Sequence, residues 1–270
     1  MPALDKLDRA EAIVEALSRS KKYRDTSAQT IRALVNEELA RHRNPKEAEK
    51  AVRKRLHNIM APYLGDPDYS AERAELEKAF ETGEDAHIRQ VCLRILKSHE
   101  STDERLPILD RFYDEIFAIT GKPGSILDIA CGLNPLAFRW MGLPASIQFH
   151  AYDILAPRIE LINAYFRLEG LAPLAQMNDV AVQFPQEEAD IALFLKELPR
   201  FERNYGKLGL PLLDTLKVRW LVVSFPAISL HGGRSLVEMY RRYFGEMIAG
   251  KAWRIIEIAF DSELVFCVEK

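Results

Sequence analysis

Cysteine is scarce in this chain, and its placement excludes two kinds of site. The three cysteines, Cys92, Cys131 and Cys267, are odd in number and do not have the spacing of metal ligands. We therefore expect neither a disulfide framework nor a metal centre. Free cysteines of this kind indicate a reducing compartment, the cytoplasm.

Long apolar runs are also missing. The N-terminal sequence MPALDKLDRAEAIVEAL intersperses acids among its apolar residues, so neither a signal peptide nor a membrane span is predicted. Hydrophobic residues make up 48% and charged residues 29% of the 270 residues, which is ordinary for a soluble globular protein. This length allows one large domain, or a domain with an appendage, to bury a proper core.

An overall excess of positive charge is absent, because the formal net charge is -3 at pH 7. Basic residues nevertheless gather locally. Seven of them stand against two acids between residues 41 and 55, and Lys21, Lys22 and Arg24 form a second cluster. Such clusters are typical of phosphate contacts, although a solvated helix face has the same composition.

The N-terminal part is predicted to be helical up to about residue 97, because apolar residues recur every three or four positions. Asn44 and Pro45 are typical of a helix start, as N-cap and first helical residue. Proline and glycine at 62–67 predict a loop, followed by more helix over 70–97. We expect a helical N-terminal region over residues 1–105.

After residue 124, short apolar runs alternate with helical segments, which is typical of parallel strands joined by crossover helices. The last two runs are three residues apart, too close for a crossover helix, so they should pair as an antiparallel hairpin. This is the architecture of class I S-adenosylmethionine-dependent methyltransferases. We predict an α/β, Rossmann-like domain over residues 106–270, with seven strands at 125–129, 148–153, 174–177, 189–195, 220–225, 254–260 and 264–268.

Acids and small residues follow the first three predicted strands. Asp128 precedes the turn Ala130-Cys131-Gly132, through which backbone amides can approach a ligand at the carboxyl end of the sheet. Asp153 ends the second strand, where a carboxylate can accept both ribose hydroxyls of an adenosine. Asn178-Asp179 can serve the adenine amino group. The fingerprint GxGxxG is absent, and the first two acids could also be a turn cap and a surface residue.

The fourth predicted strand runs into Leu195-Lys196-Glu197-Leu198-Pro199, where methyltransferases of this fold present groups to the nucleophile. The segment lacks an Asn/Asp-Pro-Pro-Tyr/Phe sequence, which disfavours methylation of an exocyclic amine. It also lacks the cysteine thiolate that pyrimidine C5 methylation needs. A nucleophile with a free lone pair, such as guanine N7, remains compatible and requires positioning without proton removal.

Four separated segments resemble the aminoglycoside-resistance 16S rRNA methyltransferases. They are SHESTDERLP at 98–107, DIACGLNPLA at 128–137, LFLKELP at 193–199 and VVSFP at 222–226. The resemblance spans nearly the whole chain. It implies a monomeric enzyme that uses S-adenosylmethionine to methylate N7 of guanine 1405 in the 30S ribosomal subunit, which blocks drugs of the kanamycin and gentamicin type.

The resemblance also implies roles for particular residues. Arg105 would bind the methionine carboxylate of the cofactor, because an arginine fork suits a carboxylate. Lys196, Phe225 and Pro226, with the loop over 229–234, would position the target base. The implied cofactor contacts are His99, Glu100, Ser101, Arg105, Asp128, Ala130, Gly132, Asp153, Ile154, Asp179, Val180 and Leu195.

In that family the N-terminal helices dock on ribosomal RNA. The resemblance therefore assigns phosphate contacts to Lys21, Lys22, Arg53, Lys54, Arg55 and Arg234. Because phosphate contacts position without specifying, we expect a base drawn out of its stack onto an aromatic platform. Candidates for the platform are Trp140, Phe201 and Tyr205, each of which could equally be core.

The chain departs from the family pattern at Arg203-Asn204, where a glutamine is usual, and Glu197 adds a charge to the fourth segment. Other functions remain open. The helices could be the lid of a small-molecule methyltransferase, the chain could be a non-catalytic ribosome-binding factor, or the target could be another RNA atom such as adenine N1 in the decoding region.

Overall fold

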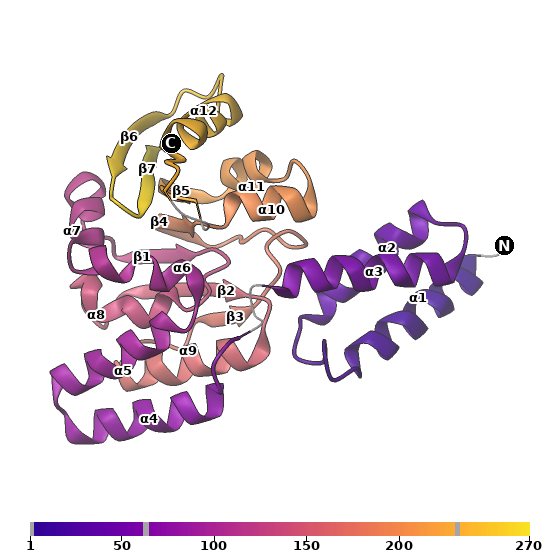
Figure 1. Cartoon of the computed structure of the whole chain (residues 1–270), viewed down its shortest axis with the longest axis horizontal. Coiled ribbons are helices and arrows are strands. Elements are labelled where there is room, and N and C mark those ends of the chain that lie inside the picture. Colours follow the sequence, from indigo (N-terminus) through magenta and orange to yellow (C-terminus); the bar gives the residue numbers. More distant parts are fainter. Residues whose placement is uncertain (1–2, 62–64, 230–232) are drawn as a thin grey trace.

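A sheet of seven strands forms the centre of the protein in the computed structural model, which describes residues 3–61, 65–229 and 233–270 (Figure 1). The strand order is β3-β2-β1-β4-β5-β7-β6. The first five strands are parallel, and β7 lies antiparallel to both β5 and β6. The predicted α/β fold with its C-terminal hairpin is confirmed. The bounds are β1 Ser125–Asp128, β2 Gln148–Asp153, β3 Ala175–Met177, β4 Glu188–Leu195, β5 Lys217–Pro226, β6 Arg254–Ala259 and β7 Glu263–Glu269.

The order of the strands fixes where a ligand can bind. The chain moves from β1 outward to β3 and then returns to add β4 on the other side of β1. Connections after β1 and β4 therefore leave the sheet in opposite directions and open a crevice between them at the carboxyl ends of these strands.

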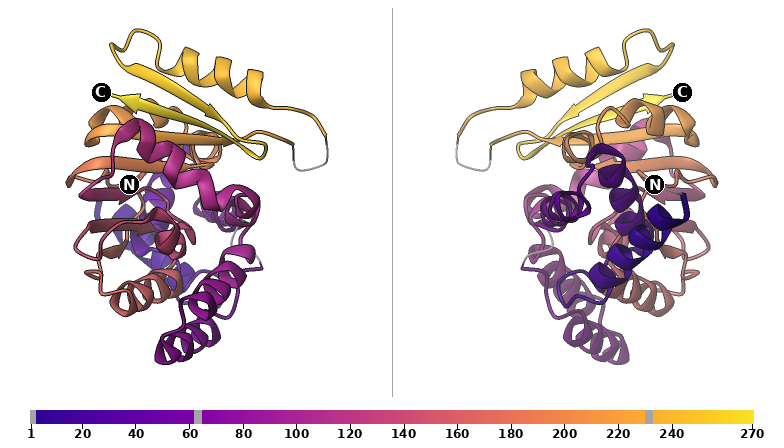
Figure 2. Two further views of the ribbon diagram at one scale, coloured as in Figure 1. Left: turned by 90° about the vertical axis from the view of Figure 1, so that its left-hand side faces the viewer. Right: turned by 90° about the vertical axis from the view of Figure 1, so that its right-hand side faces the viewer.

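Each face of the sheet has its own hydrophobic core. One core lies under α4 (Tyr69–Thr82), α5 (Asp85–Lys97), α7 (Leu109–Thr120), α8 (Phe138–Met141) and α9 (Ala156–Leu168). The other lies under α10 (Leu198–Tyr205), α11 (Gly209–Thr215) and α12 (Val237–Met247). The side views in Figure 2 place α12 and the β6–β7 hairpin at the opposite end of the molecule from α4 and α5.

The first three helices project from the sheet and form what we call the N-terminal lobe (Figure 1): α1 (Ala3–Ser18), α2 (Ala28–Arg41) and α3 (Pro45–Met60). The lobe has a small core of its own, which also includes Ile154 and Leu155. Asn44 caps α3, as predicted, by accepting a hydrogen bond from the Lys46 amide at 3.0 Å. The helices predicted over 1–105 thus pack in two groups, because α4 and α5 belong to the core of the sheet.

The segment between α3 and α4 and the loop after β5 are described only in part. The predicted loop residues 62–64 and 230–232 lie outside the described residues. Within the described ranges, no helix has the length and apolar composition needed to cross a bilayer.

Candidate functional site

The site is built on two tight connections at the carboxyl edge of the sheet. Ala130, after β1, has φ 50°, and Lys196, after β4, has φ 58°; both are left-handed conformations that are uncommon outside glycine. Gly132 completes the first turn with φ 55°. Because such conformations cost free energy and cluster at functional sites, these two turns mark the same edge as the crevice between β1 and β4.

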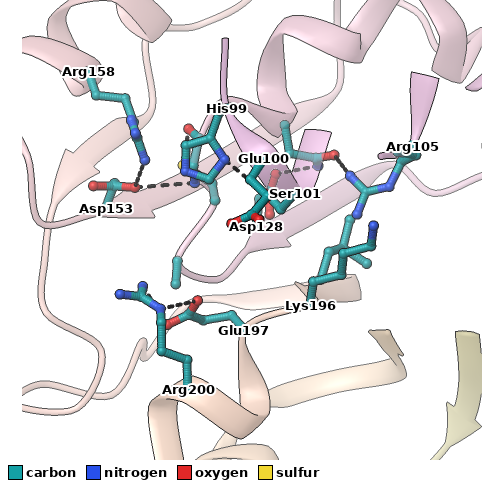
Figure 3. Close-up of a pocket in the computed structure, with 15 residues that line it drawn as sticks. His99, Glu100, Ser101, Arg105, Asp128, Asp153, Arg158, Lys196, Glu197 and Arg200 are labelled. Carbon is teal, nitrogen blue, oxygen red and sulfur yellow. Dashed lines mark hydrogen bonds and ion pairs between the residues drawn. The ribbon is translucent and has the colours of Figure 1, made fainter. Parts of the chain in front are cut away.

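Two adjoining cavities open at this edge and share Ala130, Asp153, Glu197 and Arg200. Figure 3 shows Asp153 and Arg158 at one end of the first cavity and Arg105 and Lys196 at the other. Each of the twelve predicted cofactor contacts lines one of the two cavities. The first holds His99, Glu100, Ser101, Arg105, Asp128, Ala130, Gly132, Asp153 and Leu195, and the second holds Ile154, Asp179 and Val180 with Ala130 and Asp153 again.

Arg105 lies at the wall of the first cavity and is only 2% exposed. Its Nε and Nη2 donate to the two oxygens of Glu263 at 2.9 and 2.8 Å, and its Nη1 donates to Asn134 Oδ1 at 2.8 Å. These bonds use three of the five guanidinium N–H groups, so a carboxylate can still be met by the remaining two.

Glu263, at the start of β7, is the counter-ion that sequence analysis missed. It is fully buried, accepts from Ser224 Oγ at 2.5 Å, and lies 3.4 Å from Lys196 Nζ. Although burial opposes ionisation, Arg105 and Lys196 hold the pKa of Glu263 below its usual value. Lys196 also pairs with Glu104 at 2.8 Å, so its ammonium group is fixed between two carboxylates.

Asp128 and Asn134 continue this network beneath the turn. The Asn134 side chain donates from Nδ2 to Asp128 at 2.7 Å, and its Oδ1 accepts from Tyr113 at 2.7 Å as well as from Arg105. Burial raises the pKa of Asp128 to about 8. Asn134 was part of a quoted motif but had no predicted role, because its partners come from three separate segments.

The second cavity carries acceptors suited to an adenine ring. Asp179 accepts from Tyr205 Oη and from the Ala181 amide, both at 3.0 Å, and burial raises its pKa. Next to it, Asn178 Oδ1 is buried and meets no donor from the part of the chain that the structure describes. A buried acceptor without a partner is costly, so this atom fits a ligand that supplies an N–H group.

His99 closes the first cavity from above in Figure 3. Burial, together with the charges of Arg158, Arg200 and Arg105, lowers the pKa of His99 to about 3. The imidazole is therefore neutral at physiological pH, and its Nδ1 lies 3.0 Å from Ser101 Oγ.

A third cavity adjoins the first and shares Glu100, Ser101, Lys196 and Arg200 with it. Pro226, Ile228, Leu236 and Tyr240 form an apolar part of its wall. Tyr240 was not predicted. It lies on α12, the helix that follows β5, and a search of that helix for aromatic residues could have found it.

Phe225 does not line this cavity, so a direct contact with the target base is not supported. Its side chain is fully buried and stacks on Tyr240 with ring centroids 4.8 Å apart. Side chains alternate along a strand. Because Ser224 faces Glu263 in the site, Phe225 must face the opposite core.

The three candidate platforms do not lie in the third cavity. Phe201 and Tyr205 line the second cavity instead. Trp140 lies on α8, where its Nε1 donates to Asp110 and its ring packs under Arg89. Arg203 and Asn204, where the family pattern departs, line the third and second cavities respectively.

The predicted phosphate-binding residues differ in what they contact. Arg55 is engaged inside the protein: it bonds Glu37 at 2.6 Å, Glu38 at 2.9 Å and the Asn204 carbonyl at 3.2 Å. The first two bonds lie within the lobe and the third joins it to α10, so a phosphate contact for Arg55 is not supported. Arg53 pairs with Glu49, and Lys22 Nζ lies 3.2 Å from His57 Nδ1. Lys21, Lys54 and Arg234 are exposed.

One face of α3 carries a basic stripe that the individual assignments did not describe. Lys46, Lys50 and Lys54 are exposed and follow each other at intervals of four residues. Residues four apart lie above one another on a helix, so these ammonium groups share one face. Arg43 is exposed just before the same helix.

Known proteins resemble this chain over almost its full length. The family model described as "Ribosomal RNA methyltransferase (FmrO)" matches residues 19–267. A 16S rRNA (guanine(1405)-N(7))-methyltransferase of Micromonospora echinospora is 32% identical over 268 residues, which cover 97% of each chain. The structure of the 16S rRNA methylase RmtB has a TM-score of 0.80 at 30% identity, covering 97% of this chain and 98% of that one. The 16S rRNA methyltransferase RmtF in complex with S-adenosyl-L-homocysteine gives 0.79 at 32% identity, with the same coverage.

Proposed function

The chain belongs to the ribosomal RNA methyltransferase (FmrO) family, and from this premise we propose that it transfers a methyl group from S-adenosylmethionine to N7 of guanine 1405 in 16S rRNA. The observation that carries the proposal is the pair of adjoining cavities, which collect a carboxylate, an arginine and a vacant amide acceptor in one crevice. Modification of this nucleotide would confer resistance to aminoglycosides of the kanamycin and gentamicin type.

The cavities fit S-adenosylmethionine by the chemistry of their donors and acceptors. Asn178 Oδ1 and Asp179 would receive the adenine amino group, Asp153 the ribose hydroxyls, and the remaining N–H groups of Arg105 the amino-acid carboxylate. When bound, the cofactor supplies an electrophilic methyl group on a sulfonium centre. The protein would hold it by both ends and leave its middle at the junction with the third cavity.

The third cavity would receive the target guanine. Its Lys196 lies at the border with the first cavity, and Pro226, Ile228 and Tyr240 provide an apolar wall for a flipped base. Guanine N7 carries a lone pair and no proton, so no side chain has to act as a base. We assign catalysis to positioning: the chain fixes two reactants at one distance and orientation.

The exposed cations of the N-terminal lobe support an RNA partner. We propose that Lys46, Lys50 and Lys54 contact phosphates of the assembled 30S subunit, together with Lys21 and the exposed Arg234 beside the third cavity. In this proposal the rRNA-binding function of the region 1–105 is centred on α1–α3, the enzyme is a monomer, and it acts in the cytoplasm, where 30S subunits are present.

The test is methyl transfer from radiolabelled S-adenosylmethionine to purified 30S subunits, with naked 16S rRNA and 50S subunits as controls, followed by mapping of the modified nucleotide. Label at N7 of guanine 1405 on 30S subunits alone is the expected result. Tight binding of S-adenosylhomocysteine without transfer to any of the three RNAs would point instead to a small-molecule acceptor or a non-catalytic factor.

A further inference from the structure

Arg158 stands out among the residues that the cofactor site does not yet explain. Among the described residues it is the largest fully buried side chain, at 1% exposure on α9, although arginine is almost never buried without partners. Its Nη1 donates to Asp153 Oδ2 at 3.1 Å, as Figure 3 shows. Further bonds lead away from the cavity, to the start of α4.

Asp66, just before α4, and Tyr69, the first residue of α4, hold the far side of the guanidinium. Nη2 of Arg158 donates to both oxygens of Asp66 at 2.9 and 2.8 Å, and Nε donates to Tyr69 Oη at 2.9 Å. The Tyr69 hydroxyl in turn donates to Asp66. The arginine is thus held by a bidentate ion pair on one side and donates to Asp153 on the other.

The same carboxylate is fixed from two further directions. Asp153 Oδ1 accepts from the Leu155 amide at 3.0 Å, and Oδ2 accepts from the Gly132 amide at 3.2 Å. Both amides belong to backbone beside the cavity, whereas Arg158 is a charged side chain that is itself anchored by residues from elsewhere in the chain. Arg158 lines the first cavity, and its anchors Asp66 and Tyr69 line neither cofactor cavity.

We propose that Arg158, anchored by Asp66 and Tyr69, is a positioning residue that orients the Asp153 carboxylate toward the cofactor ribose, so that these two residues at the start of α4 support cofactor binding. The inference rests on the proposed function, because it takes Asp153 as the ribose ligand. A carboxylate that accepts two vicinal hydroxyls must hold one orientation, and the bidentate Asp66 pair prevents the long arginine side chain from changing rotamer.

The test substitutes Asp66→Asn, which keeps the shape of the side chain but removes the charge that holds Arg158. Asp68→Asn is the matched control, because it makes the same chemical change two residues away. Asp68 caps α4 by accepting from the Ser70 and Ala71 amides and is not a hydrogen-bond partner of Arg158. Binding of S-adenosylhomocysteine is measured by calorimetry on the full chain. We expect Asp66→Asn to weaken it by about tenfold, the worth of one charge-assisted hydrogen bond, and Asp68→Asn to leave it unchanged.

A second ligand separates positioning from general damage to the fold. An S-adenosylhomocysteine analogue without the 2′ and 3′ hydroxyls cannot bond Asp153 through the ribose, so Asp66→Asn should weaken its binding far less. Tyr69→Phe should give a smaller loss with the same dependence on the hydroxyls. Steady-state kinetics should show a raised KM for S-adenosylmethionine with kcat nearly unchanged.

The outcomes distinguish the inference from its premise. If Asp66→Asn weakened binding of S-adenosylhomocysteine and of the analogue equally, the positioning role would be overturned. Equal losses of S-adenosylhomocysteine affinity in Asp66→Asn and Asp68→Asn would overturn it as well. Unchanged affinity in Asp66→Asn alongside lost affinity in Asp153→Asn would also overturn it while leaving the proposed function intact. Failure of the unsubstituted protein to bind S-adenosylhomocysteine would instead refute the proposed function.

Discussion

Individual charged side chains in this site lie where water is excluded, and each depends on a named partner. Arg105, Glu263 and Arg158 are almost completely buried, and each forms an ion pair at hydrogen-bonding distance. Removing one member of such a pair leaves a buried charge uncompensated, which costs far more than loss of a surface pair. Substitutions in the cofactor site will therefore change stability as well as binding.

Arg105→Ala is the clearest case. Glu263 would keep Ser224 and Lys196 but lose two donated hydrogen bonds and the charge of the guanidinium. We expect the free energy of unfolding to fall by about 3–5 kcal/mol, measured by urea denaturation at pH 7. Arg73→Ala breaks an exposed pair with Glu77 and should cost less than about 1 kcal/mol. Similar small losses in both variants would contradict the assignment of a buried ion pair.

Asp128 should make stability depend on pH in an uncommon direction. Its pKa of about 8 in the folded protein lies above the value of about 3.9 for an unperturbed aspartate, so between these values the folded state holds a proton that the unfolded state has lost. The free energy of unfolding should therefore decrease as pH rises through this window, by at most about 1.4 kcal/mol per pH unit.

Asp128→Asn removes the titrating group and tests that slope. The stability of the variant relative to the unsubstituted protein should rise between pH 6 and 8 and stop changing above about pH 9, as followed by urea midpoints at each pH. The Asn134 bond to Asp128 is the local interaction that an amide can replace. If the two proteins instead gave parallel pH curves, Asp128 would be ionised throughout this range.

At the scale of elements, periodicity predicted the strands well because each depends on local sequence. The predicted strand over 148–153 matches β2, and β4 begins one residue earlier than predicted. Strand identity did not reveal which face of the sheet each side chain meets, so the burial of Phe225 in the core opposite the site was not foreseen. The division of the N-terminal helices into two groups was not predicted either. Leu76 and Ala79 of α4 belong to the core of the sheet through contacts with residues distant in sequence.

We assign the basic residues of α3 two roles, RNA contact and support of the fold, which composition alone does not distinguish. Lys50→Glu with Lys54→Glu should weaken binding to 30S subunits and reduce its salt dependence by about one unit of log-log slope for each lost phosphate contact. Affinity for S-adenosylhomocysteine and the melting temperature should stay the same. Arg55→Glu should instead destabilise the fold, because it places a third acid beside Glu37 and Glu38. Equal loss of cofactor affinity in the lysine double variant would show that the stripe supports the fold.

At the scale of the whole molecule, the site is assembled from pairs that no local pattern predicts. Arg105 and Glu263 are 158 residues apart, and Arg158 and Asp66 are 92 apart. The acids at strand ends were predictable because the carboxyl ends of the parallel strands β1 to β5 meet at one edge. Their counter-ions were not, because a partner for a buried charge can come from any segment that the fold brings near.

The N-terminal lobe is attached to the rest of the protein at the walls of the cofactor cavities. On one side the Ser27 amide donates to the Ile154 carbonyl at 2.8 Å, and the Ala156 amide donates to the Asp25 carbonyl at 2.9 Å. Ile154 and Ala156 closely follow Asp153 in the chain. On the other side Arg200, which pairs with Glu197 in the cavity, donates to the Ile59 carbonyl at 2.9 Å. We therefore expect a structural change in the lobe to alter the cavity walls, and a change in the cavity walls to alter the lobe.

This arrangement predicts coupling between the cofactor and the ribosomal subunit. With saturating S-adenosylhomocysteine, affinity for 30S subunits should increase by about fivefold, the low end of typical couplings, because an occupied cavity fixes both attachments of the lobe. Thermodynamic linkage requires 30S subunits to tighten S-adenosylhomocysteine binding by the same factor. Lys50→Glu with Lys54→Glu should lower both 30S affinities yet leave their ratio intact, whereas Arg200→Ala should bring the ratio toward one. Equal 30S affinity with and without S-adenosylhomocysteine would show that the lobe docks independently of the cavity it adjoins.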